Sequence, residues 1–375
     1  MAVSNQNNLN QKESYIKFIE SQSIICDRYV DIRRIDENAG DGCFSLVFKA
    51  KDVQNNKREI ALKFFNPLEV GNKYRLDCFF RESDLLKKLR GKPNILPLIQ
   101  EKTDFNLNLK TKDGILFTLK LMFHSSELGK FNISNYIYTQ KTDYLTNILF
   151  FREICKAVQR IHKHKIMHRD LKPGNFLVYN KKYVCLSDFG TARYSSSKEK
   201  PIRNHYNFPQ GDKRYTAPEI LCGLHFSDDY NFYADIYSLG AILFELFAKT
   251  ILSENIFKGI EIDKLSEYFH GVPENNRIEI FNGFIGGFSK NQELPNIREF
   301  DVNIPKAIYY EVDILYKRLA CLDYRKRERN FERIFNRINI CEKVIKYLKK
   351  IERWRKNKED RSCLTLHLKS KITRD

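Results

Sequence analysis

The sequence predicts an α+β fold of two lobes, a β-rich N-lobe of about residues 28–123 and a mainly helical C-lobe of about residues 124–335. In the first region, short apolar or alternating runs are separated by turn residues, which is the pattern of strands. Beyond residue 134, apolar residues recur at spacings of three and four, which is the pattern of helices. The chain has 375 residues, of which 42% are hydrophobic, so it can bury a sizeable core.

The chain begins with a polar, Asn/Gln-rich extension, residues 1–27. Only its segment SYIKFIE (14–20) has the spacing of an amphipathic helix. We expect either a frayed end or a helix that docks on the N-lobe.

Four predicted strands and one helix make up the N-lobe. The helix lies in YRLDCFFRESDLLKKLR (74–90), where Phe79, Glu82, Leu86 and Leu89 share one face. The strands are predicted within FSLVFKA (44–50), REIALKFF (58–65), ILPLIQ (95–100) and ILFTLKLMF (115–123).

A glycine-rich turn, GDGCFS (40–45), leads into the strand predicted within FSLVFKA (44–50). Gly40 and Gly42 stand where a phosphate-binding loop has its first two glycines, and Ser45 replaces the third. Glycine lets backbone N–H groups approach a phosphate closely, because a Cβ would block the approach. Taken alone, two glycines at this spacing are also compatible with an ordinary hairpin.

The C-lobe contains HRDLKPGNFLV (168–178) followed by LSDFGTAR (186–193). We predict a two-strand hairpin between them, with its turn near residues 179–182. Asn175 and Asp188 then lie at the outer ends of the hairpin, so that two oxygen-bearing side chains meet in one place. Such oxygens suit a hard divalent cation.

These two motifs, at this separation, resemble those of the eukaryotic-type Ser/Thr protein kinase family, and the resemblance extends from about residue 28 to 335. It implies a bilobal protein-kinase-like fold and transfer of the γ-phosphoryl group of ATP to Ser/Thr hydroxyls of protein substrates. By resemblance, Asp170 accepts or orients the hydroxyl proton and Lys172 stabilises the transferring group. Asn175 and Asp188 would hold Mg²⁺, with Mn²⁺ as an alternative ion.

The resemblance also implies an ATP site. Lys63 would contact the α- and β-phosphates and pair with Glu82, while Leu177 would lie beneath the adenine. The ATP-binding set expected in this way is Gly40, Gly42, Val47, Ala61, Lys63, Glu82 and Leu177.

Further residues match structural or regulatory positions of the family. Glu219 of the APE segment would pair with Arg327, and Asp235 would anchor the catalytic loop. Leu86 would stack with His168 and Phe189. The structural and regulatory residues expected in this way are His168, Arg169, Phe189, Gly190, Arg193, Tyr206, Asp212, Glu219, Asp235 and Arg327.

Two departures from the family pattern concern the activation segment. Asp212 stands where Ser/Thr kinases usually carry a threonine; it cannot donate to Asp170 when ionised but can pair with Lys172. Arg169 and Arg193 resemble a pocket for an activation-loop phosphate, yet residues 198–214 contain no Ser or Thr. The remaining acceptors are Ser195, Ser196, Ser197 and Tyr206, unless Lys198, Glu199 and Lys200 order the loop without modification.

Two alternatives to protein phosphorylation stay open. A pseudokinase scaffold would bind nucleotide and partner proteins without transfer, but Lys63, Asp170 and Asp188 are all present. A small-molecule or lipid substrate is disfavoured by Lys172 and by the APE segment. Gly174 stands where basophilic kinases often have glutamate, and the net charge is +18, so we expect acidic or neutral peptide substrates.

The basic charge is concentrated at the C-terminal end. Residues 321–375 contain 18 Lys+Arg against 8 Asp+Glu, and residues 336–375 are predicted to form a basic helical extension. This extension docks on the C-lobe, binds an anionic partner or is simply solvated; no nucleic-acid module is indicated. Nine scattered cysteines and the lack of any transmembrane segment favour a cytoplasmic protein.

Overall fold

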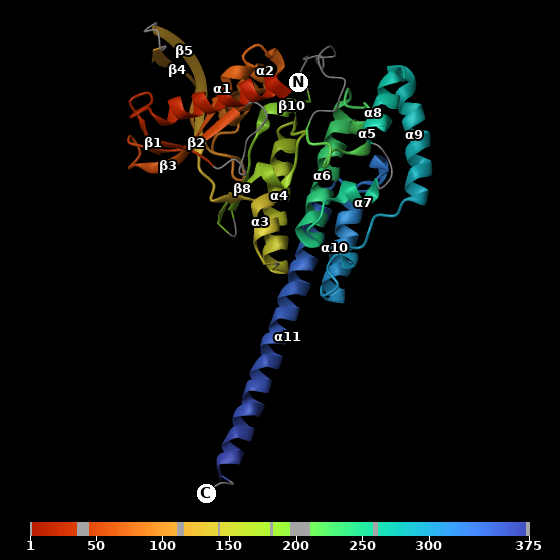
Figure 1. Cartoon of the computed structure of the whole chain (residues 1–375). Helices are drawn as coiled ribbons and strands as arrows, with labels where there is room; N and C mark the ends of the chain where they lie inside the picture. Colours follow the sequence, from red (N-terminus) through yellow and green to blue (C-terminus); the bar gives the residue numbers. More distant parts are fainter. Residues whose placement is uncertain are drawn as a thin grey trace.

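A five-stranded antiparallel sheet forms the N-lobe of the computed structural model (Figure 1). The strand order is β1-β2-β3-β5-β4. The strands are β1 (Tyr29–Arg34), β2 (Ser45–Asp52), β3 (Arg58–Phe65), β4 (Leu98–Lys110) and β5 (Leu116–Glu127). The structure describes residues 2–35, 45–110, 116–141, 143–180, 183–195, 211–257 and 262–372. The five-stranded sheet confirms the prediction of a β-rich N-lobe.

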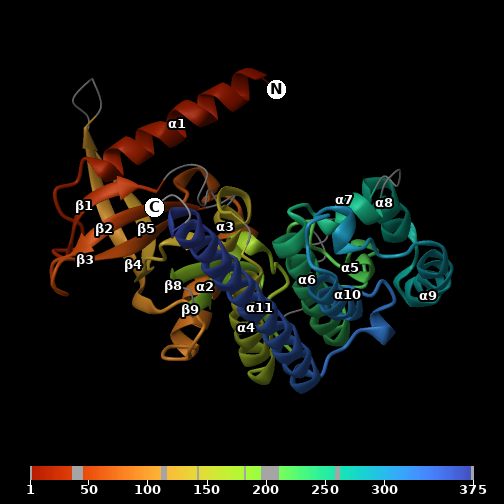
Figure 2. The same cartoon turned by 90° about the horizontal axis from the view of Figure 1, so that it is seen from below.

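One face of the N-lobe sheet is covered by the N-terminal helix. Alternate residues of β2 and β3, such as Phe48 and Phe64, bury one face in a small core. Helix α1 (Ala2–Glu20) covers that core, because Ile16 and Ile19 are buried in it (Figure 2). Of the two outcomes expected for the N-terminal extension, the docking helix is the one observed.

Helix α2 (Lys73–Lys88) positions Glu82 for the site. Asn72 begins the helix, since its side chain accepts a hydrogen bond from the Arg75 N–H. Phe79, Glu82 and Leu86 are buried on one face, as their spacing predicted.

The C-lobe is built around α6 (Asp228–Ala248), whose residues from Ala234 to Ala248 are all buried. Gly240 lets α6 approach α10 closely, because a Cβ at this position would lie 2.5 Å from the Ala320 nitrogen. The other helices of the lobe are α3 (Ile133–Thr139), α4 (Tyr144–Lys163), α5 (Pro218–Leu221), α7 (Leu252–Ile256), α8 (Ile262–Gly271), α9 (Glu274–Asn291) and α10 (Lys306–Leu319).

Short strands and 3₁₀ turns of the C-lobe form the floor of the site. The strands β8 (Phe176–Asn180) and β9 (Tyr183–Leu186) make the predicted hairpin, and β6 (Phe131–Asn132) pairs with β8. Strands β7 (Ile166–Met167) and β10 (Arg193–Tyr194) pair separately. The 3₁₀ turns of the C-lobe are η3 (Pro173–Asn175), η4 (Phe189–Thr191), η5 (Ile297–Glu299) and η6 (Tyr324–Lys326); η2 (Pro67–Glu69) lies in the N-lobe, between β3 and α2.

Helix α11 (Phe331–Ile372) is 42 residues long and begins five residues before the predicted extension. Its first turns dock on the C-lobe core through Ile334, Ile338, Cys341 and Ile345, all of which are buried. Beyond them the helix leaves the C-lobe and extends away from it (Figure 1). The extension thus has a docked part and a projecting part.

Candidate active site

A cleft of about 760 Å³ lies between the N-lobe sheet and the β8–β9 hairpin. Val47, Ala61 and Lys63 line it from the sheet, and Leu177 and Asp188 line it from the hairpin. Five of the expected ATP-binding residues, Val47, Ala61, Lys63, Glu82 and Leu177, therefore border one cavity. The other two, Gly40 and Gly42, lie outside the described residues.

Lys63 connects the two lobes inside this cleft. Its ammonium nitrogen Nζ lies 2.6 Å from Glu82 Oε2 and 3.3 Å from Asp188 Oδ1. Burial alone would lower the pKa of Lys63, but the carboxylates of Asp188 and Glu82 outweigh it and raise that pKa. Burial alone would raise the pKa of Glu82, and the Lys63 charge instead holds it below its ordinary value. Lys63 and Glu82 are therefore both charged at neutral pH.

His124 lies beside this ion pair and was not found by sequence reasoning. It is opposite Lys63 across β3 and β5, only 1% of its surface is exposed, and its Nε2 atom lies 3.8 Å from Glu82 Oε2. Its ring packs on Phe79 with 5.3 Å between ring centres, and neither ring nitrogen has a hydrogen-bond partner among the described residues. The strand was predicted to end at Phe123, and the only available signal was the alternation of His124 with Ser126 directly after it, since both side chains face the cleft.

The hairpin brings Asn175 and Asp188 together, as its spacing predicted. Phe176 pairs with Leu186, and the Ser187 N–H donates to the Asn175 carbonyl at 2.9 Å. Asp188 has a left-handed backbone with φ of 59°, which is uncommon for a residue other than glycine and aims its carboxylate at Lys63.

An amide and a carboxylate oxygen suit Mg²⁺, which commonly takes one or two protein carboxylates together with phosphate oxygens. In the part of the chain that the structure describes, no cluster of three or more His, Cys, Asp or Glu side chains could hold a metal by itself. Asn175 and Asp188 thus fit a metal that is shared with a phosphate ligand.

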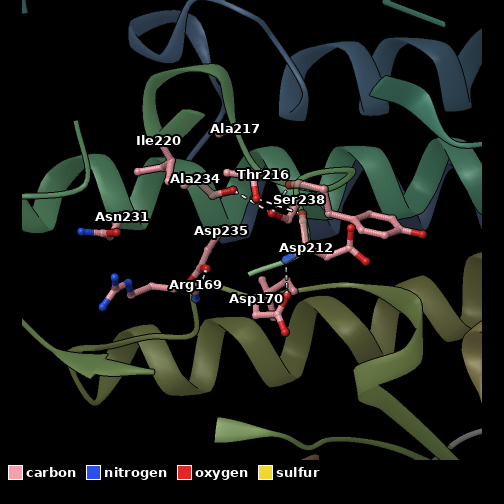
Figure 3. Close-up of a pocket in the computed structure, with 12 residues that line it drawn as sticks. Arg169, Asp170, Asp212, Thr216, Ala217, Ile220, Asn231, Ala234, Asp235 and Ser238 are labelled. Atoms are coloured by element: carbon pink, nitrogen blue, oxygen red, sulfur yellow. Dashed lines mark hydrogen bonds between the residues drawn. The ribbon is translucent and has the colours of Figure 1, made fainter. Parts of the chain in front are cut away.

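Asp170 is held by several donors. Its Oδ2 accepts from Lys172 Nζ at 3.0 Å, and its Oδ1 accepts from the Asp212 N–H at 2.8 Å (Figure 3). Asn175 Nδ2 donates to the Asp170 carbonyl at 2.8 Å. Burial raises the pKa of the Asp170 carboxyl, although the Lys172 charge acts in the opposite direction. A basic carboxylate is therefore fixed between Lys172 and the Asp212 N–H.

The expected pairing of Asp212 with Lys172 is wrong in this structure. The Asp212 carboxylate instead accepts from Arg214 Nε at 2.9 Å and Nη2 at 2.6 Å. The reason is geometric, because a guanidinium two residues away binds both carboxylate oxygens at once, while Lys172 is already engaged by Asp170. Asp212 contacts Asp170 through its backbone N–H rather than through its side chain.

The side chain of Asp235 points from α6 toward the segment that carries Arg169 and Asp170 (Figure 3). Its two carboxylate oxygens accept from the backbone N–H groups of His168 and Arg169, both at 2.9 Å. His168 in turn contacts the Ser187 carbonyl through Nε2 at 3.0 Å and packs edge-on against buried Phe189. This chain of contacts links α6 to the residues that flank Asp188.

Two contacts hold the ends of the activation segment, and the first of them was expected. Glu219 and Arg327 form a bidentate ion pair in which both side chains are 0% exposed. At the other end, the Gly190 carbonyl accepts from Arg81 Nη1 at 2.6 Å. Arg81 on α2 was not anticipated.

Arg169 lies in a strongly positive environment. Burial lowers the pKa of Arg169, and the charges of Arg193 and Arg81 lower it further. Arg81 of α2 therefore adds its charge to those of the two arginines in the predicted basic pocket. Three of the four candidate phosphate acceptors, Ser196, Ser197 and Tyr206, lie outside the described residues.

The outer end of the same cleft carries a buried acid that sequence reasoning missed. Glu245 on α6 accepts hydrogen bonds from the hydroxyls of Tyr138 and Tyr215, each at 2.7 Å. All three residues line the cleft, together with Arg214. Burial raises the pKa of Glu245 above its ordinary value.

The chain belongs to the protein kinase family, because the protein kinase domain model matches residues 33–336. It is 31% identical to a probable serine/threonine-protein kinase of Dictyostelium discoideum over 67% of this chain and 36% of that relative. It is 30% identical to a probable cyclin-dependent kinase 8 of the same organism, over 60% of this chain and 55% of that relative.

A third relative is the serine/threonine-protein kinase ULK3 of Xenopus laevis, which is 27% identical over 65% of this chain and 48% of its own length. The matches thus span about a third to a little over half of these three relatives. Separately, no helix in the described part of the chain is long and apolar enough to cross a membrane.

Proposed function

We propose that this protein transfers the γ-phosphoryl group of ATP to Ser or Thr hydroxyls of protein substrates. The observation that carries the proposal is the geometry around Asp170. Its carboxylate accepts hydrogen bonds from Lys172 and from the Asp212 N–H, and the hairpin that brings Asn175 and Asp188 together follows it in the chain. Phosphoryl transfer requires mainly positioning and neutralisation of charge, and these residues supply both.

Each residue has a distinct task in this proposal. Asp170 orients the substrate hydroxyl and accepts its proton, while Lys172 neutralises charge on the transferring group. Lys63, held by Glu82, binds the nucleotide phosphates. Asn175 and Asp188 hold Mg²⁺, or Mn²⁺ in its place, and the ion neutralises phosphate charge when bound.

The competing hypothesis is a pseudokinase that binds nucleotide and partners without transfer. The Lys63–Glu82–Asp188 arrangement favours the enzyme, because Lys63 Nζ already contacts the side chains of both acidic residues. A scaffold would require neither this arrangement nor the hydrogen bonds that hold the Asp170 carboxylate.

The experiment is a radiolabelled ATP transfer assay with a generic protein, an acidic peptide and an arginine-rich peptide as acceptors. We expect transfer by the wild type and at least a hundredfold loss in Asp170→Ala and Lys63→Ala. Lys88→Ala, at the exposed end of α2, is the matched control and should retain activity. Binding of ATP without transfer by the wild type would support the scaffold instead.

We also propose acidic or neutral peptide substrates, an anionic partner for the C-terminal extension and a cytoplasmic location. The net charge of +18 supports the first two proposals, because complementary charge favours association. The cysteines whose side chains the structure describes are all free, which supports a reducing compartment.

A further inference from the structure

Helix α11 carries an apolar stripe that begins in its docked part and continues into its projecting part. Ile340, Tyr347 and Trp354 are 41%, 65% and 64% exposed. Val344 and Ile351, both half-buried, fall between them and complete a spacing of four, three, four and three residues. We call these five residues the α11 seam. A 4-3-4-3 spacing places all five on one narrow line of a helix.

Most of the α11 seam lies off the face by which α11 docks on its own C-lobe; only Val344, at the edge of the seam, packs against the C-lobe core. The docking face has the same 4-3-4-3 spacing and consists of the buried residues Ile334, Ile338, Cys341 and Ile345, followed by half-buried Leu348. At 3.6 residues per turn, the two lines are separated by roughly a third of the circumference of the helix. The other four seam residues therefore remain available after α11 has docked, and the helix projects beyond the lobe at the C-terminal end of the seam (Figure 1).

The surroundings of the seam are strongly basic. Residues 343–358 contain eight Lys or Arg and a single acidic residue, Glu352. Two of the basic side chains are engaged within the chain, since Lys346 pairs with Glu342 and Lys349 with Asp143.

Three other cations, Lys343, Lys350 and Arg355, flank the seam and form no ion pair with any residue that the structure describes. Lys358 continues the line of the seam and lies over the Trp354 ring, 5.5 Å from its centre. The seam is thus an apolar line with cations along its edges and at its end.

We propose that the α11 seam binds an amphipathic helix of a partner protein, and that this helix has an apolar stripe flanked by acidic residues. The 4-3-4-3 spacing matches the seam of a paired helix, which places knobs at these positions. Acidic flanks on the partner would face Lys343, Lys350 and Arg355, the positions that select partners in helix pairs.

The same observations disfavour two other occupants. A second copy of this chain would bring a second strongly basic helix against the first, and like charges repel. A membrane surface suits a broad apolar face, whereas the α11 seam is a narrow line with cations close on both sides.

Trp354 makes the proposal directly testable, because it is the only tryptophan of the chain and lies on the seam. The probe is a synthetic 21-residue peptide of three heptads, with Ile and Leu at the seam positions and Glu at both flanks. Titrated into the full-length protein, it should shift the Trp354 emission to the blue and saturate. The same peptide with Lys at the flanks should bind at least tenfold more weakly.

Two variants separate the seam from unspecific charge attraction. Tyr347→Glu should weaken binding of the acidic peptide at least tenfold, because it places a charge in the middle of the seam. Tyr268→Glu on α8 is the matched control, since Tyr268 is 61% exposed and lies off α11, and it should bind like the wild type. Circular dichroism checks that both variants keep the wild-type helix content.

Three results would overturn the proposal. The first is an emission shift with phosphatidylserine vesicles but not with the acidic peptide, which would assign the seam to a membrane. The second is a concentration-dependent shift with a dimer mass in light scattering, which would assign it to a second copy. The third is equal binding of the acidic peptide by Tyr347→Glu and the wild type, which would reduce the contact to surface charge.

Discussion

Glu219 and Arg327 form a fully buried ion pair, with Arg327 Nη2 2.9 Å from Glu219 Oε2. It joins the end of the activation segment to the segment that leads into α11. The guanidinium also donates to the Cys321 carbonyl and lies over the Tyr237 ring. The charged groups of both side chains therefore have partners, and removal of either side chain would leave the charge of the other buried and unpaired.

Replacement of this arginine should destabilise the C-lobe strongly. We expect Arg327→Ala to lower the free energy of unfolding by about 3–5 kcal/mol, as is typical when one partner of a buried pair is removed. Arg325→Ala is the control, because Arg325 is exposed and its pair with Asp323 is worth roughly 1 kcal/mol or less. Urea denaturation followed by circular dichroism measures both; similar losses in the two variants would contradict the prediction.

The contacts of Asp212 predict an order of activity among variants. Asp212→Ala should lower kcat/KM more than Asp212→Thr, because a threonine hydroxyl can donate to Asp170 whereas alanine leaves position 212 without a polar side chain. Arg214→Ala should resemble Asp212→Ala, since Arg214 holds the Asp212 carboxylate. Steady-state kinetics with a peptide acceptor decides, and wild-type rates in both Asp212 variants would refute the prediction.

His124 is expected to act through Glu82. His124→Phe keeps the ring packed on Phe79 but removes the imidazole that faces the Glu82 carboxylate. We expect KM for ATP to rise about fivefold, equivalent to roughly 1 kcal/mol, with a smaller change in kcat. In a Glu82→Gln background the same substitution should have no further effect. Additive losses in this double-mutant cycle would show that His124 has only a packing role.

Glu245 predicts a pH dependence of stability. Because burial raises its pKa, the folded protein binds more protons than the unfolded chain between the ordinary glutamate pKa and the raised one. This contribution to stability is fully present below the ordinary pKa and is lost as the pH rises through the raised pKa. Glu245→Gln cannot titrate, so its stability relative to the wild type should increase from pH 4.5 to pH 7.5.

The measurement is the free energy of unfolding in urea at several pH values. Glu254→Gln is the control, because Glu254 is exposed on α7 and should show no such trend. If the wild type instead gained stability relative to Glu245→Gln as the pH rises, the pH dependence would have the opposite sign and would contradict the raised pKa of Glu245.

Much of the site followed from local pattern. The hairpin from Phe176 to Leu186 was predictable because two short apolar runs flank a polar turn, and its geometry then brings Asn175 close to Asp188. Glu82 and Leu86 share a face of α2 because helical periodicity fixes it. Lys63 was recognised by resemblance, and its contact with Glu82 is observed.

Other contacts could not be predicted, because they join side chains that are far apart in the sequence and have no periodic relation. The choice of Arg214 over Lys172 as the partner of Asp212 depends on which cation is already engaged. The place of His124 beside Glu82 depends on how β5 and α2 pack, and the Tyr138–Glu245–Tyr215 cluster joins α3, α6 and the activation segment.

The sequence by itself determined the two lobes, the catalytic hairpin and the helical character of the extension, because periodicity and short motifs act over a few residues. Tertiary structure decided which face of α11 docks and which stays exposed. Both faces carry apolar residues at the same 4-3-4-3 spacing, and only the shape of the C-lobe between α4 and α10 selects Ile338 and Ile345 for burial and leaves Tyr347 and Trp354 in solvent. Burial is a property of the surface that receives a side chain, and no local pattern contains it.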